Sequence, residues 1–285
     1  EGTADLLDFS KMESDGIELS LSTGGAVNFE NLIGTNSGET LRGNSGDNEI
    51  RGVDQAHDAL GPDTIYGEAG NDVLTASNQN DVLYGGAGDD RLIGSGGNNV
   101  FDGGAGADVI TTGAGNDVIV LRAGDGGTKL SPSQAIWDFD TIDPTYGPGY
   151  FGAYASEADV IRDFTKGSDT FALADGLSFS DLTITKIGPA DVIGGFPENR
   201  PSIAVGWSPH PNGIDNYTLI SLGENPYGAM ETSTEHLAVI KGLHDLTELD
   251  FVQVDSSGRV VPPEARFSGL KLSDPPPQES SLISN

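Results

Sequence analysis

Residues 67–120 read GEAGNDVLT, ASNQNDVLY, GGAGDDRLI, GSGGNNVFD, GGAGADVIT and TGAGNDVIV when written as consecutive nine-residue windows. The sixth position of each window is polar and mostly acidic: Asp72, Asp81, Asp90, Asn99, Asp108 and Asp117. The eighth position is always apolar: Leu74, Leu83, Leu92, Phe101, Ile110 and Ile119. This fixed phase indicates a repeated structural unit and not a glycine-rich linker.

Each window combines a bend with a short strand. Glycine at the first and fourth positions of most windows permits positive φ and close approach of backbones. The residues after the acid, such as 73–75, form a strand whose alternation turns the eighth side chain inward. Carboxylates together with bend carbonyls make a set of hard oxygen ligands, which suits Ca²⁺ better than zinc or copper. One aliphatic side chain per window is a thin core, so we expect the repeats to fold only when calcium binds.

The windows resemble the hemolysin-type calcium-binding nonapeptide repeat of RTX proteins, which are secreted bacterial proteins. The resemblance implies an all-β fold, a right-handed parallel β-roll or β-solenoid in which positions eighteen residues apart stack along one edge. Asp72, Asp90 and Asp108 would line one edge, and Asp63, Asp81, Asn99 and Asp117 the other. Since Asn99 is neutral, the sites that it shares would be the weaker ones. We expect about six to eight ions, one between each pair of stacked turns.

The expected metal ligands are side-chain oxygens at the sixth positions and backbone oxygens at the first and third positions. The candidates are Asp63, Gly67, Ala69, Asp72, Asp81, Gly85, Ala87, Asp90, Gly94, Asn99, Gly103, Ala105, Asp108, Asp117 and Asp163.

The repeats predict five regions along the chain. These are N-terminal strands leading into the roll (1–33), the RTX roll (34–122), a Gly/Pro/aromatic insertion (123–158), a C-terminal β cap continuing the solenoid (159–255) and a Pro-rich polar tail (256–285). Two flanking elements also resemble the family: FENLIG at 29–34, and DVIRDFTKGSD at 159–169, which closes many rolls. Further strands are expected at 4–10, 16–21, 218–222 and 237–242, and a surface loop containing His57 at 53–61. The chain begins with Glu1, so we expect it to be a piece of a longer polypeptide.

The insertion and the tail each leave two interpretations open. Asp138, Asp140 and Asp143 resemble the start of a calcium loop but lack its Gly and closing Glu. The aromatic residues Trp137, Phe139, Tyr146, Tyr150, Phe151 and Tyr154 form either a small core that anchors the loop or a sugar- or partner-binding surface. The tail is either disordered or an arm that adds a strand through Phe267, Leu270 and Leu272.

The amino-acid composition limits which partners and which cellular compartment suit the protein. The formal net charge is −30, from 14 basic and 44 acidic residues, which makes nucleic acid an unsuitable partner. There is no cysteine, and no apolar run predicts a membrane span. Calcium can serve as the staple of a disulfide-free extracellular protein, because extracellular calcium is millimolar. The RTX resemblance implies type I secretion, and therefore a secreted, extracellular or cell-surface location.

No catalytic constellation stands out. The four histidines, at positions 57, 210, 236 and 244, form no HExxH motif, and Gly206–His210 lacks the last glycine of a nucleophile elbow. We therefore expect no enzyme, but a structural, adhesive or self-assembling fibre or surface-layer component. The alternative is the C-terminal secretion and folding module of a larger RTX hydrolase, epimerase or toxin. A lesser alternative is a glycan-binding module for cell-surface polysaccharide.

Overall fold

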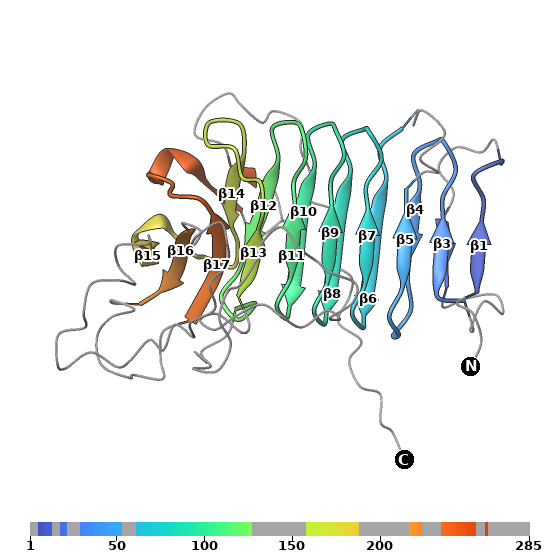
Figure 1. Cartoon of the computed structure of the whole chain (residues 1–285), viewed down its shortest axis with the longest axis horizontal. Coiled ribbons are helices and arrows are strands. Elements are labelled where there is room, and N and C mark those ends of the chain that lie inside the picture. Colours follow the sequence, from blue (N-terminus) through green and yellow to red (C-terminus); the bar gives the residue numbers. More distant parts are fainter. Residues whose placement is uncertain are drawn as a thin grey trace, which may run out of the picture.

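The structure is a computed structural model of the 285-residue chain, and the residues that it describes are 5–12, 18–21, 29–52, 61–126, 158–187, 217–223, 235–254 and 260–261. Short strands lie side by side in a row, from β1 at one end to β15–β17 at the other (Figure 1). From β1 to β15 successive strands alternate between two sheets, so this part of the chain winds as a flattened coil. The predicted all-β parallel β-roll is confirmed.

The first sheet contains, in spatial order, β1 (Leu6–Asp8), β3 (Asn31–Ile33), β5 (Glu49–Arg51), β7 (Val73–Thr75), β9 (Arg91–Ile93), β11 (Val109–Thr111), β13 (Asp159–Ile161), β17 (Glu235–Lys241), β16 (Tyr217–Leu222) and β15 (Leu182–Ile187). The second contains β19 (Val260–Val261), β18 (Phe251–Val254), β14 (Thr170–Leu173), β12 (Val118–Leu121), β10 (Val100–Ala105), β8 (Val82–Ala87), β6 (Thr64–Ala69), β4 (Thr40–Arg42) and β2 (Glu18–Ser20). The 3₁₀ turns η1 (Phe179–Asp181) and η2 (Glu248–Asp250) precede β15 and β18.

Parallel pairing places residues eighteen apart beside each other through the regular repeats. Leu74 pairs with Leu92 in the first sheet, and Leu83 with Phe101 in the second. Sequence insertions between coils leave the pairing intact. Ile110 pairs with Ile161, on the far side of the long insertion. The strand register therefore follows the apolar eighth position and not the length of the connecting segment.

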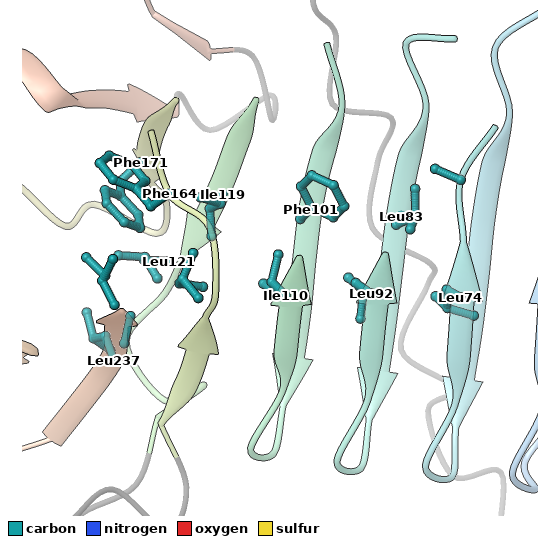
Figure 2. Close-up of a cluster of buried hydrophobic side chains, with 14 of the residues drawn as sticks. Leu74, Leu83, Leu92, Phe101, Ile110, Ile119, Leu121, Phe164, Phe171 and Leu237 are labelled. Atoms are coloured by element: carbon teal, nitrogen blue, oxygen red, sulfur yellow. The ribbon is translucent and has the colours of Figure 1, made fainter. Parts of the chain in front are cut away.

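The core is a stack of eighth-position side chains between the two sheets (Figure 2). Leu74, Leu83, Leu92 and Ile110 are fully buried, and Phe101 extends into the same stack. Each coil contributes one such side chain from each sheet, so the core contains only two of them per coil. Their burial cannot by itself offset the ordering of two glycine-rich turns per coil.

The C-terminal region continues the solenoid and then closes it. Strands β13, β14, β17 and β18 add further parallel coils, with Phe171 stacked between Phe164 and Phe251 at centroid distances of 4.8 and 5.4 Å. Beyond them the chain reverses: β15, β16 and β17 pair antiparallel, as do β18 and β19. The sequence predicted the strands at 218–222 and 237–242 but not β15, β19 or the antiparallel reversal, because periodicity does not reveal direction.

Several expectations concern segments outside the described residues. They are the loop with His57, the acidic trio and aromatic set of the insertion, Gly206–His210 and the tail from 262 onward. No helix in the described part of the chain is long and apolar enough to cross a membrane.

Candidate metal centres along the edges of the roll

Each coil has two bends, which stack into two edges. The first edge consists of the turns that lead from the second sheet to the first: 43–48, 67–72, 85–90 and 103–108. The second edge consists of the turns that lead back: 34–39, 76–81, 94–99, 112–117 and 163–169. The sixth-position side chains of neighbouring turns meet at these edges, as the 18-residue spacing predicts.

A ladder of hydrogen bonds joins the sixth positions of the first edge. The Asn48 N–H donates to Asp72 Oδ1 at 2.7 Å, and the Asp72 N–H to Asp90 Oδ1 at 2.7 Å. The Asp90 N–H donates to Asp108 Oδ1 at 2.8 Å, and the Asp108 N–H to Asp159 Oδ1 at 3.2 Å. One oxygen of each acid therefore satisfies the backbone of the preceding coil, which orients the carboxylate.

The second edge carries an equivalent ladder. Its N–H donors and Oδ1 acceptors are, in sequence, Glu39 to Asp63, Asp63 to Asp81, Asp81 to Asn99, Asn99 to Asp117 and Asp117 to Asp169, at 2.7–3.2 Å. Asn99 can occupy this ladder because its amide oxygen accepts in the same way as a carboxylate oxygen.

Four of these acids have a second oxygen that is buried without a hydrogen-bond partner: Oδ2 of Asp72, Asp90, Asp108 and Asp117. The residues themselves are at most 2% exposed. An anionic oxygen excluded from water and left without a donor is strongly destabilising unless a cation compensates it. This is the structural feature that fits a hard metal ion.

The first-position glycines leave room beside these oxygens. A Cβ on Gly85 would lie 2.4 Å from Asp90 Oδ2 and 2.4 Å from the carbonyl oxygen of Gly103. At Gly67 the corresponding distances to Asp72 Oδ2 and the Gly85 carbonyl are 2.4 and 2.5 Å. A carboxylate oxygen and a carbonyl oxygen of the next coil thus face one glycine, and no larger residue fits there. This mixed oxygen set suits Ca²⁺.

The pKa values of the ladder acids also fit a bound cation. Burial raises the pKa of Asp63 and Asp108 to about 8, and that of Asp72, Asp90 and Asp117 to about 7. Neighbouring carboxylates add to the effect: Asp72 acts on Asp90, and Asp90 on Asp108. A divalent cation between the coils would relieve both desolvation and mutual repulsion.

The other predicted ligands lie at defined places in the same turns. Ala69, Ala87 and Ala105 are paired in register on β6, β8 and β10, next to the first edge. A Cβ on Gly103 would lie 2.1 Å from Asp108 Oδ2, whereas one on Gly94 would meet the Thr112 carbonyl oxygen and the Phe101 ring. Among the described residues no three His, Cys, Asp or Glu side chains form a metal cluster. An ion here would therefore complete its coordination with backbone or water oxygens.

Asp163 lies away from the ladders. Its Oδ1 accepts the N–H and hydroxyl of Thr112 at 2.7 and 3.0 Å, and its Oδ2 accepts the Gly113 N–H at 3.0 Å. Both carboxylate oxygens are thus engaged in tying the 112–117 turn to the cap.

Two sets of residues were missed at the sequence level. Asp159 and Asp169 continue the ladders into the cap, and their positions two residues before Ile161 and Phe171 could have revealed them. Fifth-position side chains form exposed ladders of their own: Asn80 Oδ1 accepts the Asn98 N–H at 2.8 Å, and Asn98 Oδ1 that of Asn116 at 2.9 Å. The recurrence of Asn and Asp at the fifth position was the available signal.

Comparison with known proteins agrees with this geometry. The model of the RTX calcium-binding nonapeptide repeat matches four copies, at residues 33–56, 57–92, 84–119 and 93–126. This part of the chain is a calcium-binding RTX β-roll module. No curated protein sequence matches the chain.

Among solved structures, the chain matches the solution structure of the AlgE6R3 subunit from the Azotobacter vinelandii mannuronan C5-epimerase. Identity is 19%, coverage is 96% of this chain and 99% of that chain, and the TM-score is 0.20. A TM-score of this size is too low for any argument to rest on the match.

Proposed function

We propose that the protein is an extracellular, non-enzymatic structural or adhesive component whose roll folds when calcium binds. The observation that carries this proposal is the set of four buried carboxylate oxygens without hydrogen-bond donors, within RTX repeats. A chain whose buried carboxylates need a cation is stable where calcium is abundant. Where calcium is scarce, the folded state loses the free energy of calcium binding.

Several features support an extracellular site of action. Outside the cell, millimolar calcium can fill weak sites, whereas in calcium-poor surroundings the stacked carboxylates would keep the chain unfolded. The formal net charge of −30 adds to that repulsion. An unfolded chain is the form that the type I secretion route of RTX proteins exports.

The absence of a catalytic role is supported by a pair of described residues that resembles a nucleophile and its base. Ser221 Oγ lies 2.8 Å from His236 Nδ1, on neighbouring strands of the cap. The two residues are 0% and 1% exposed, and burial lowers the pKa of His236. No substrate can approach a hydroxyl enclosed in this way, so the pair is a core contact.

The ends of the solenoid bear on assembly. In the described part of the chain β1 is the last strand of its sheet. Leu6 in this strand is 49% exposed, and Met12, four residues after the end of the strand, is 50% exposed. The other end is turned by antiparallel strands. This asymmetry favours contacts through the β1 end over open head-to-tail filaments. Association with a second copy or with cell-surface polysaccharide remains part of the proposal.

The second candidate function is a secretion and folding module of a larger RTX hydrolase, epimerase or toxin. The exposed β1 end favours it, because a preceding domain could cover Leu6 and Met12 there. Both functions require calcium-dependent folding, but they differ in the assembly state of the folded chain.

Size-exclusion chromatography with light scattering, in millimolar calcium and in excess chelator, separates the two. A calcium-dependent rise in mass supports the structural or adhesive component. A monomer that contracts in calcium without a gain in mass supports the folding module. An unchanged size, together with unchanged far-ultraviolet circular dichroism, contradicts calcium-dependent folding altogether.

A further inference from the structure

The turns of the roll fall into two conformational classes. In open turns the second residue has positive φ: Glu68 at 81°, Gly86 at 115°, Gly104 at 94° and Gly113 at 85°. In closed turns the second residue is Thr35, Asn44, Ser77 or Ser95, or in the cap turn Thr165. Among the described residues Glu68 and Asp175 are the only non-glycine residues with positive φ, so the second residue of each closed turn lacks it.

Closed turns satisfy their own sixth-position side chain. The Ser77 N–H and hydroxyl both donate to Asp81 Oδ2, at 2.7 and 2.8 Å. The Thr35 N–H donates to Glu39 Oε2 at 3.2 Å, and its hydroxyl to Glu39 Oε1. In each pair the donor precedes the acid by four residues.

The remaining closed turns have similar internal hydrogen bonds. The Thr165 N–H donates to Asp169 Oδ2 at 2.7 Å, and the Asn44 N–H to Asn48 Oδ1 at 2.8 Å. In the 94–99 turn the acid is replaced by Asn99, whose amide donates to the Gly96 carbonyl at 3.2 Å. A closed turn therefore leaves no anionic oxygen without a donor.

Open turns differ because one oxygen of their acid has no hydrogen-bond donor. They end at Asp72, Asp90, Asp108 and Asp117, the same four acids whose Oδ2 atoms are buried without a partner. A positive φ at the second residue turns its N–H away from the acid four residues later. The conformation of one residue thus decides whether the carboxylate is compensated internally or left to a cation.

We propose that calcium binds only at the open turns, and that hydrogen bonds from Ser77, Thr35 and Thr165 replace the metal at the closed turns. This proposal rests on the calcium-binding function stated above. It adds that some turns bind calcium and others do not. The first edge has three successive open turns, at 67–72, 85–90 and 103–108. Calcium ions therefore bind there in a continuous row. Among the second-edge turns that the structure describes in full, only the 112–117 turn is open. Asp81 and Asn99, both candidate ligands from sequence, then hold no calcium.

The count of ions in the unmodified chain is the first test. Native mass spectrometry and equilibrium dialysis with ⁴⁵Ca²⁺ should give four ions at saturation in the turns that the structure describes in full, one for each unpartnered Oδ2. Six to eight ions in those turns would overturn the proposal, because closed turns would then have to be loaded. No bound calcium would overturn the calcium-binding function itself, which is a separate outcome.

Three isosteric variants identify the sites: Asp90→Asn (open, first edge), Asp117→Asn (open, second edge) and Asp81→Asn (closed, second edge). Calorimetric titration with Ca²⁺ should show that Asp90→Asn and Asp117→Asn each lose at least one ion or weaken binding by about tenfold or more. Asp81→Asn should keep the wild-type count and affinity. Circular dichroism in saturating calcium checks that each variant folds.

The comparison of Asp117→Asn with Asp81→Asn is decisive, because both lie on the same edge. Equal losses in the two variants would show that the turn conformation does not control loading. If a variant does not fold, the ion count of the unmodified chain still decides the question.

Discussion

Asp90 Oδ1 accepts the backbone N–H of Asp72 at 2.7 Å, whereas Asp90 Oδ2 is buried without a partner. One carboxylate thus joins two coils through one oxygen and leaves the other oxygen for a cation. Rotating the group to expose Oδ2 would break the coil-to-coil bond. In the folded roll the carboxylate is therefore held in position by the backbone of the neighbouring coil.

Removal of calcium should unfold the roll. At a calcium concentration of about 100 times Kd, each bound ion adds about 2.7 kcal/mol to the free energy of unfolding, and chelation removes all of it. Far-ultraviolet circular dichroism should lose its β signal in excess chelator and regain it when calcium is restored. A full β spectrum in chelator would contradict the prediction.

In calcium-free buffer, acid should stabilise the fold. The folded-state pKa values of Asp72 and Asp90 are about 7 and that of Asp108 about 8, all above the ordinary 3.8. The folded state therefore binds more protons, and its stability falls as pH rises from about 4 through 8. In calcium-free buffer, the β signal in far-ultraviolet circular dichroism should therefore be larger at pH 5 than at pH 8.

In saturating calcium the trend should reverse, because protons and calcium compete for the same oxygens. Melts at the same two pH values then give the higher Tm at pH 8. The same direction of change in both buffers would argue against these carboxylates as the shared site.

Shortening one core side chain should destabilise the whole stack. Leu92 is fully buried between Leu74 and Ile110, so Leu92→Ala should lower the free energy of unfolding by about 2–5 kcal/mol. Urea titration in millimolar calcium measures the change. Leu249→Ala is the control: Leu249 is 83% exposed, and its loss should cost at most about 0.5 kcal/mol.

A methyl group on a first-position glycine should block both packing and metal binding. In Gly85→Ala the Cβ would meet Asp90 Oδ2 and the Gly103 carbonyl, each at 2.4 Å. We expect this variant to lose calcium-induced folding. Circular dichroism during a calcium titration measures the loss. Gly167→Ala serves as the control, since φ is 89° there and no atom lies within 4 Å, so it should cost only roughly 1–2 kcal/mol of backbone strain.

The exposed asparagine ladder should matter for stability but not for calcium. Asn98→Ala removes the acceptor of the Asn116 N–H and should cost at most about 1 kcal/mol. The number of calcium ions, measured by calorimetry, should stay the same. A lost ion would mean that the fifth position takes part in metal binding.

The sequence by itself determined the repeating unit and the direction of its side chains. Leu74, Leu92 and Ile110 could be assigned to the core because an apolar residue every nine positions permits only one inward-facing row. The carboxylates two residues before each of them followed from the same phase. These features are local, since they depend on the geometry of one turn and one strand.

Only the tertiary structure decided which carboxylates are satisfied without metal. Asp81 and Asp90 occupy the same position of their windows, yet Asp81 Oδ2 receives two hydrogen bonds and Asp90 Oδ2 none. The antiparallel closure by β15 and β16 was likewise not specified by the repeat pattern. The reason is that a hydrogen bond depends on φ at the turn and on which coil lies next to it. Neither is specified by the spacing of residues along the chain.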